Sequence, residues 1–298
     1  MKAIYDVPAP AKLNLFLHVT GRRADGYHLL QSVFMLIDWH DSLHFELREG
    51  GALSREDLGP PLPADDLCLR AARALQHATG TRHGAHIAID KRVPAQAGMG
   101  GGSSDAASCL LALNRLWQLG LDLPALEKIG LALGADVPFF LRGRNAWVEG
   151  IGERITPIPL APARFLVVKP DQGLDTSKIF ADPQLQRSTE PAILSGFAAH
   201  YFGNESETGR EFGRNDLQPV AQRLCPGVTQ ALEWLASQGL QGRMTGSGSA
   251  VFARMPEGTT PSNLSGSLPG NWQARVCSNM EAHPLVGWAP SDKLSVGG

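Results

Sequence analysis

The chain has 298 residues, of which 43% are hydrophobic and 19% charged, and its formal net charge is −2. Its length allows one large or two ordinary domains, and its near-neutral charge excludes a bulk positive field for nucleic acid or an anionic membrane. The four cysteines form no CxxC pair or zinc-spaced cluster, and neither a signal-peptide core nor an apolar run of about 20 residues is present. We therefore expect a cytoplasmic protein that binds neither nucleic acid nor membranes.

The first half of the chain predicts a mixture of strands and amphipathic helices. Apolar runs and apolar–polar alternation predict strands at Leu13–Val19, Ser32–Asp38, Ser42–Arg48 and His86–Lys91. Apolar spacing and end signals predict helices at Asp66–Thr79, Ser104–Leu119 and Pro124–Leu133. Asp65 or Asp66 is the expected cap of the first helix, and Gly80 its expected stop. The Gly/Pro-rich stretch Glu49–Pro63 carries no predicted element.

A proline-rich segment, Ile155–Pro162, predicts a boundary between a domain of residues 1–158 and a second domain of residues 159–285. Residues 286–298 are expected to form a disordered tail. The second half predicts helices at Ile193–Phe202, Asp216–Leu224 and Val228–Ser237, strands at Phe165–Val168, Ala250–Met255 and Trp272–Cys277, and a flexible loop at Thr259–Pro269. Strands and helices mix without a regular βαβα rhythm, which favours an α+β fold over a doubly wound sheet.

The most informative segment is a glycine-rich loop between a predicted strand and a predicted helix. It consists of Pro94, Ala95, Gln96, Ala97, Gly98, Met99, Gly100, Gly101, Gly102, Ser103 and Ser104. Glycines without Cβ atoms let a backbone close around an anion, and the N–H groups and dipole of the following helix favour phosphate at its start. The two serines can cap that helix or donate hydroxyls to phosphate and magnesium. The alternative is an ordinary glycine turn with a serine cap.

Two common nucleotide-binding motifs do not fit this loop. A P-loop requires GxxxxGK[ST], and no lysine follows these glycines. The dinucleotide motif GxGxxG requires a glycine where Ser103 stands. The loop therefore predicts a phosphate-binding site of another kind.

Three segments, in order, resemble the three motifs of the GHMP small-molecule kinases. They are Pro10–Leu15, the glycine-rich loop and Met244–Phe252. Further stretches resemble the family members that phosphorylate a cytidine diphosphate derivative of methylerythritol: Asp25–His28, Leu133–Phe140 and Arg214–Leu217. The likeness spans residues 9 to about 280. It departs from the family at Gln96, where glycine is usual, and this residue is expected to alter the packing at the loop's entry.

The resemblance implies a two-domain GHMP kinase fold of the α+β class. Its N-terminal domain would carry a left-handed βαβ crossover, its C-terminal domain would be ferredoxin-like, and the active site would lie in the cleft between them. It also implies ATP-dependent phosphorylation of the substrate's 2-hydroxyl in non-mevalonate isoprenoid biosynthesis, with ATP as phosphoryl donor and Mg²⁺ as cofactor. A monomer or a homodimer is expected.

Two other functions stay open. One is a GHMP kinase of the homoserine or mevalonate type, against which the cytidine-type segment Asp25–His28 argues. The other is a non-catalytic nucleotide-binding protein, against which the retention of both Lys12 and Asp136 argues, because binding alone requires neither.

By similarity, Asp136 is the catalytic base for the substrate hydroxyl, although its place before Val137 and Pro138 also fits a helix cap. Lys12 would keep Asp136 ionised and neutralise the transferring phosphoryl group; the alternative is a surface lysine on an edge strand. Asn14 would hydrogen-bond near the same hydroxyl.

The resemblance also implies a pocket for the substrate's base and a magnesium ligand. Tyr27, His28 and Phe180 would form the cytidine pocket, with core packing as the alternative for the two aromatic residues. Thr176 would contact the substrate, and Ser104 would coordinate magnesium. Thr245–Ser249 would stabilise the phosphate loop, although alone it also fits a tight turn.

Overall fold

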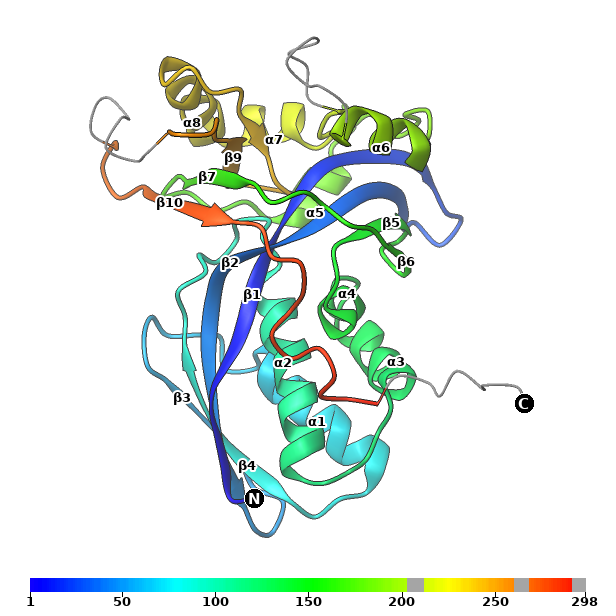
Figure 1. Ribbon diagram of the computed structural model, residues 1–298. Coiled ribbons are helices and arrows are strands. Elements are labelled where there is room, and N and C mark those ends of the chain that lie inside the picture. Colours follow the sequence, from blue (N-terminus) through cyan, green and yellow to red (C-terminus); the bar gives the residue numbers. More distant parts are fainter. Residues whose placement is uncertain (203–211, 260–267, 291–298) are drawn as a thin grey trace.

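The computed structural model describes residues 1–202, 212–259 and 268–290. Two long antiparallel strands, β1 (Ala3–Arg22) and β2 (His28–Arg48), run through the molecule from end to end (Figure 1). They pair from Ala3 opposite Glu46 to Arg22 opposite His28, with bulges where the register shifts. The two strands predicted at Ser32–Asp38 and Ser42–Arg48 are therefore halves of one strand. β2 continues through the polar residues between them because their backbones remain paired with β1.

The first sheet has the order β3-β4-β2-β5-β6, with β1 paired to β2. β3 (Leu53–Asp57) lies within the stretch that carried no predicted element, and it pairs in parallel with β4 (Gly84–Asp90). Helix α1 (Leu67–Thr79) connects them, so these three elements form a βαβ unit of the implied kind. The left hand of its crossover stays a prediction. The antiparallel pair β5 (Ala146–Gly150) and β6 (Arg154–Pro157) was not predicted from sequence.

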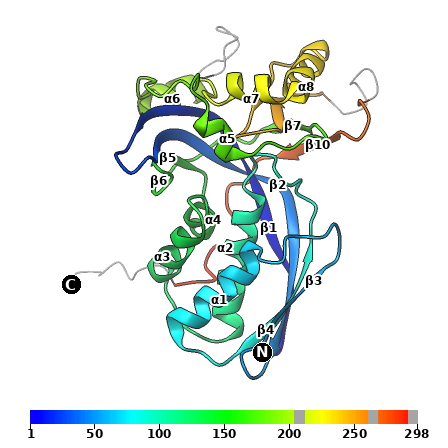
Figure 2. The same cartoon turned by 180° about the vertical axis from the view of Figure 1, so that it is seen from behind.

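Four helices pack on this first sheet (Figure 2). They are α1, α2 (Gly101–Leu116), α3 (Leu123–Leu133) and α4 (Val137–Arg142). Asp66 caps α1, because its side chain accepts from the Leu69 N–H, and Gly80 ends it in the left-handed conformation; both confirm the prediction. α2 is buried almost throughout, from Ser104 to Asn114, with Leu110 and Leu113 fully buried.

The second sheet is antiparallel, in the order β10-β7-β9-β8. Its strands are β7 (Arg164–Lys169), β8 (Arg243–Met244), β9 (Val251–Arg254) and β10 (Gln273–Ser278). In chain order within this sheet, the fourth strand lies beside the first, then the third and the second, which is the ferredoxin-like arrangement. The helices of this half are α5 (Thr176–Ala181), α6 (Leu194–Phe202), α7 (Gln218–Leu224) and α8 (Pro226–Ser237). Most of the predicted loop Thr259–Pro269 lies outside the described residues.

Both halves of the molecule share the long strands and a common core. Leu13 and Met35 of β1 and β2 pack in one buried cluster with Phe165 and Phe252 of the second sheet. The change of sheet between β6 and β7 falls at the predicted boundary near residue 158, although as a domain boundary this stays a prediction. Among the described residues, no helix is long and apolar enough to span a membrane.

The end of the described chain returns to the first half. Trp288 packs against the first core, and the Leu123 N–H donates to the Pro290 carbonyl at 2.9 Å. The prediction of a disordered tail is therefore wrong for residues 286–290. Trp288 and Ala289 pack on the core of the first half, whose other residues lie far away in the sequence. Residues 291–298 lie outside the described residues.

Candidate active site

The glycine-rich loop closes tightly because two of its glycines have no room for a side chain. A Cβ on Gly98, whose φ is +71°, would lie 2.7 Å from the Gly248 nitrogen and closer still to the Thr245 carbonyl oxygen. A Cβ on Gly100, whose φ is +70°, would lie 2.9 Å from the Phe140 ring. The loop then passes directly into α2, whose first N–H groups lack helical partners. This is a backbone cradle suited to phosphate.

Gln96 takes the conformation that glycine would favour. Its φ is +51°, in the left-handed region, and its carbonyl accepts from the Ser249 N–H at 3.1 Å. Its side chain packs closely against Gly173. Gln96 therefore contributes side-chain packing at the loop's entry that a glycine there would lack.

The third motif, Met244–Phe252, holds the glycine-rich loop in place. The Ala250 N–H donates to the Ala97 carbonyl at 3.2 Å, next to the bond between Ser249 and Gln96. The Asn14 N–H donates to Thr245 Oγ1 at 2.9 Å, which joins this motif to the first. On the other side of the loop, the Lys12 N–H donates to the Met99 carbonyl at 3.0 Å, beside a β1 bulge. The three segments are thus one hydrogen-bonded unit.

Asn215 holds the third motif through hydrogen bonds to its backbone. Its buried Nδ2 donates to the carbonyls of Met244 and Gly246, each at 2.8 Å, and its Oδ1 accepts from the Leu217 N–H. Its neighbour Asp216 accepts from the Val19 N–H of β1 at 2.8 Å. The Arg214–Leu217 segment is therefore a structural clamp on the site.

Replacing Asn215 with alanine should lower the free energy of unfolding by about 2–4 kcal/mol. The change leaves two carbonyls and one N–H without their buried partner, and each unpaired group costs about 1–3 kcal/mol before relaxation. Urea denaturation measures the change. A loss below about 0.5 kcal/mol would show that Asn215 does not hold the motif.

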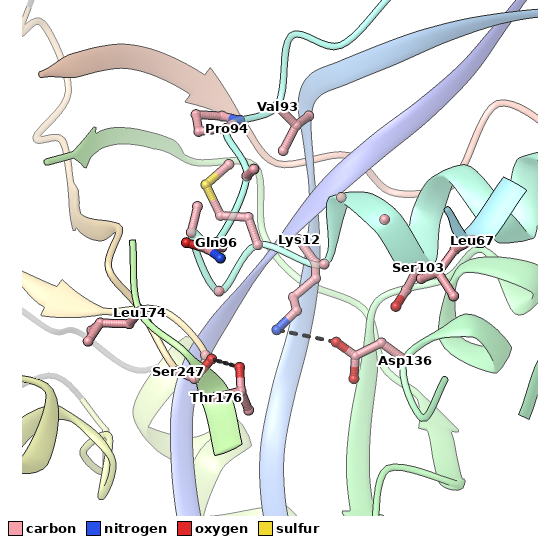
Figure 3. Close-up of a pocket in the computed structure, with 18 of the residues that line it drawn as sticks. Lys12, Leu67, Val93, Pro94, Gln96, Ser103, Asp136, Leu174, Thr176 and Ser247 are labelled. Carbon is pink, nitrogen blue, oxygen red and sulfur yellow. Dashed lines mark hydrogen bonds and ion pairs between the residues drawn. The ribbon is translucent and has the colours of Figure 1, made fainter. Parts of the chain in front are cut away.

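Lys12 and Asp136 face each other across the pocket (Figure 3). Lys12 Nζ lies 3.7 Å from Asp136 Oδ2, and the two side chains are 4% and 29% exposed. Asp136 stands at the start of α4 but makes no capping hydrogen bond, so its carboxylate is available to a substrate. Lys12 is buried rather than on a surface, and burial lowers its pKa while Asp136 opposes that effect. The ammonium is therefore poorly hydrated, which strengthens its field at the carboxylate.

Asn14 holds Lys12 rather than standing free beside it. Lys12 Nζ donates to Asn14 Oδ1, and Asn14 Nδ2 donates to Ser32 Oγ at 2.8 Å. Lys12 Nζ also lies 4.7 Å from the centre of the Phe34 ring, where a cation–π contact supports it. Asn14 still lines the pocket, but its amide already has protein partners on both sides.

A pocket of about 710 Å³ contains these residues, and both halves of the molecule line it. Its lining includes Leu62, Pro63 and the residues from Asp65 to Cys68, then Lys91, Val93, the glycine-rich loop from Pro94 to Ser103, Leu30, Thr176 and Phe180. In the close-up, Leu67, Ser103 and Asp136 lie on one side of Lys12, and Leu174, Thr176 and Ser247 lie on the other (Figure 3). This arrangement suits a nucleotide on the Leu67 side and an acceptor on the Thr176 side, with the reacting atoms between them.

The structure brings some of the predicted base-binding residues together. Phe180 lines the pocket, and the His28 ring stacks on it with centroids 4.9 Å apart. Thr176 Oγ1 lies 2.6 Å from Ser247 Oγ, so α5 is joined to the third motif (Figure 3). Tyr27, by contrast, is 62% exposed in the turn between β1 and β2 and does not line the pocket.

The two serines after the glycines have different surroundings. Ser104 is fully buried, and its Oγ donates to the Pro10 carbonyl at 2.7 Å. Ser103 lines the pocket on the side of Asp136 (Figure 3). Neither serine caps α2, whose N-terminal cap is Gly100, so of the two roles left open for them capping does not apply. For the predicted magnesium contact, the geometry favours Ser103 over Ser104.

A buried cluster of ionisable side chains beside the loop was not predicted from the sequence. Lys91 pairs with both Asp41 and Asp105, the latter at 2.6 Å, and Asp41 Oδ1 accepts from the N–H groups of Arg92 and Val93. Asp41 thereby fixes the chain just before Pro94. The one sequence feature that could have indicated this cluster is a pair of opposite charges that flank the loop, Lys91 before it and Asp105 after it.

Asp105 should make stability depend on pH. Burial raises the pKa of Asp105 to about 8, with Asp41 adding to the effect and the Lys91 ammonium opposing it. The folded state then keeps a proton that the unfolded state, with a pKa near 3.8, has lost. The free energy of unfolding should therefore fall as pH rises from about 4 to about 8, by up to ~1.4 kcal/mol per unit, and level off above. Denaturation of wild type and Asp105→Asn across this range measures the effect; equal slopes would contradict it.

Comparisons with known proteins agree with this geometry. The family description "GHMP kinases N terminal domain" matches residues 66–144, and "GHMP kinases C terminal" matches residues 198–273. Together with the relatives below, these matches show that the chain belongs to the GHMP kinase family. It is therefore an enzyme that transfers a phosphoryl group from ATP to a small molecule.

Two bacterial relatives are similar over their full length. The 4-diphosphocytidyl-2-C-methyl-D-erythritol kinase of Albidiferax ferrireducens is 66% identical over 100% of this chain and 99% of its own. The kinase of the same name from Variovorax paradoxus is 67% identical over 97% of this chain and 100% of its own. A crystal structure of a 4-(cytidine 5'-diphospho)-2C-methyl-D-erythritol kinase, 32% identical, covers 93% of this chain and 99% of its own with a TM-score of 0.74.

Proposed function

We propose that the chain transfers the γ-phosphoryl group of ATP to the 2-hydroxyl of 4-diphosphocytidyl-2-C-methyl-D-erythritol, in non-mevalonate isoprenoid precursor biosynthesis. The observation that carries the proposal is the Lys12–Asp136 pair, 3.7 Å apart, between a phosphate cradle and a pocket end that contains Phe180. The substrate itself rests on the relatives that share 66–67% of the sequence. A monomeric or homodimeric enzyme in the cytoplasm remains part of the proposal.

ATP would lie with its phosphates on the glycine-rich loop. The N–H groups at the start of α2 would hold the phosphate oxygens, and the helix dipole favours their negative charge. The adenosine would occupy the Leu67 side of the pocket. The terminal phosphate would then lie near Lys12 and Asp136.

The acceptor hydroxyl would lie between Asp136 and that phosphate. Its oxygen attacks the γ-phosphorus, the bond to the β–γ bridging oxygen breaks, and ADP leaves. Asp136 orients the hydroxyl and takes its proton as the new bond forms, which suits a loose transition state and a weak base. Lys12 stabilises the charge on the transferring oxygens, and Asn14 keeps its ammonium in place.

Magnesium would enter with ATP rather than bind a protein cage. Among the described residues, no group of three or more acidic, histidine or cysteine side chains could hold a metal ion. The pocket does offer a hard oxygen donor of the type magnesium prefers, in Ser103. When bound, the ion would neutralise charge on the phosphates.

The test is ADP release by the wild-type enzyme with ATP, Mg²⁺ and each of three acceptors. We expect kcat/KM for the cytidine substrate to exceed that for homoserine and mevalonate by at least about 1,000-fold, because only that acceptor reaches both Asp136 and the Phe180 end. Turnover of homoserine or mevalonate alone would overturn the substrate assignment. ATP binding without turnover of any acceptor would overturn catalysis by this site.

A further inference from the structure

Arg55 of β3 is a nearly buried cation beside the active-site pocket. Its side chain is 10% exposed and forms ion pairs with Asp57, Nε to Oδ1 at 2.8 Å, and with Asp66, Nη1 to Oδ1 at 3.2 Å. The two terminal nitrogens also donate to main-chain carbonyls, that of Leu62 at 3.1 Å and that of Pro63 at 2.7 Å. One guanidinium therefore joins β3 to residues 58–66, which we call the β3–α1 connection.

The β3–α1 connection can make few hydrogen bonds within itself. It contains three prolines, and a proline has no N–H group to donate. Its carbonyls therefore need donors from elsewhere, which Arg55 supplies, because a guanidinium has donors only. Asp57 adds the complementary contact, since its Oδ2 accepts from the Leu62 N–H at 3.0 Å as well as from Arg55. Both main-chain polar groups of Leu62 are thus held by one ion pair.

The β3–α1 connection also forms part of the pocket wall, through Leu62, Pro63, Asp65 and Asp66. Asp66 caps α1 by accepting from the Leu69 N–H at 3.0 Å, so Arg55 also restrains the start of the helix that brings Leu67 to the pocket (Figure 3). Among the described residues, Arg55 makes no hydrogen bond or ion pair with the glycine-rich loop. Its contacts therefore hold one wall of the pocket and leave the phosphate cradle alone.

We propose that Arg55 is a positioning residue for the nucleoside half of ATP: it holds the β3–α1 connection as the wall against which the base packs. This inference rests on the proposed function, which places adenosine on the Leu67 side of the pocket. Leu62, Pro63 and Leu67 offer apolar surface of the kind that a base requires. Since the glycine-rich loop would hold the phosphates independently, Arg55 should affect the binding of ATP but not that of a triphosphate without a nucleoside.

Arg73 provides a matched control on α1. It pairs with Asp65 of the same connection, but the two side chains are 55% and 68% exposed. Exposed ion pairs contribute little, because water and salt screen them. Arg73→Met therefore removes an arginine contact to the connection without freeing any main-chain group that Arg55 holds.

The experiment compares wild type, Arg55→Met, Arg55→Lys and Arg73→Met. Calorimetric titration in Mg²⁺ gives Kd for ATP and for inorganic tripolyphosphate, and steady-state kinetics give KM and kcat. In Arg55→Met we expect Kd and KM for ATP to rise about 10- to 100-fold, while Kd for tripolyphosphate, KM for the cytidine substrate and kcat stay within about 3-fold. Arg55→Lys, which keeps the charge but not the forked geometry, should fall between. Arg73→Met should stay within about 3-fold of wild type throughout.

An unchanged Kd for ATP in Arg55→Met, an equal loss of tripolyphosphate affinity, or an equal effect of Arg73→Met would overturn the proposal. If the Arg55 variants fail to fold, amide hydrogen exchange of the wild-type enzyme decides. ATP should slow exchange in residues 58–66 and tripolyphosphate should not, and equal exchange with the two ligands would overturn the proposal. A wild-type enzyme that binds ATP in this way but does not turn over the cytidine substrate would instead refute the proposed function.

Discussion

Replacing Asp136 with asparagine should lower kcat by about 100- to 10,000-fold, the range for losing a general base. The amide keeps the size of the side chain but cannot take the proton of the acceptor hydroxyl. It also removes the negative partner of the buried Lys12 ammonium, 3.7 Å away. Initial rates at saturating ATP and acceptor measure the loss.

Two further measurements show whether the loss in Asp136→Asn is chemical. Asp136 makes no capping bond and lies outside the phosphate cradle, so the Kd for ATP should change less than about 3-fold. The variant should also remain folded, as judged by urea denaturation. A kcat within about 3-fold of wild type would remove Asp136 from the catalytic role.

Replacing Gly98 with alanine should damage both stability and ATP binding. The residue has φ +71°, which costs a non-glycine residue about 1–2 kcal/mol, and its Cβ would press on the backbone of the third motif. We expect the free energy of unfolding to fall by at least about 2 kcal/mol and KM for ATP to rise at least about 10-fold. The losses of stability and of ATP binding have one cause, because the added Cβ would push the glycine-rich loop away from the third motif that holds it closed.

Gly102 provides the matched control for stability. It belongs to the same loop but is already helical, and a Cβ there would lie 3.4 Å from Leu67 Cδ1, an ordinary contact. Gly102→Ala should therefore leave stability unchanged or raise it by up to about 1 kcal/mol, since alanine favours a helix. If both alanine variants were equally stable, close backbone approach at Gly98 would not be what restricts that position.

Features encoded by neighbouring residues could be predicted from the sequence. The cap and stop of α1, Asp66 and Gly80, act within a few residues of the helix ends, so local pattern is enough to find them. The phosphate-binding role of the glycine-rich loop could also be predicted, because its glycines and the helix that follows are neighbours in the sequence. The roles of Lys12 and Asp136 came from the resemblance, and the structure adds their separation and burial.

Features that depend on three-dimensional placement could not be predicted. α2 begins at Gly101, three residues before the expected start, so Ser103 and Ser104 are both inside the helix. Successive side chains of a helix point about 100° apart. Ser104 consequently faces β1, while Ser103 faces the pocket. The cluster of Asp41, Lys91 and Asp105 joins residues far apart in sequence, and only folding makes these ionisable side chains buried neighbours.

The proposed reaction is tested most directly by ³¹P NMR of the wild-type enzyme with ATP, Mg²⁺ and the cytidine substrate. We expect one new phosphomonoester on the 2-oxygen of the methylerythritol unit for each ADP formed, with the cytidine diphosphate signals retained, and almost no product with Asp136→Asn. ADP release without that phosphomonoester, or a phosphate on another hydroxyl, would contradict it.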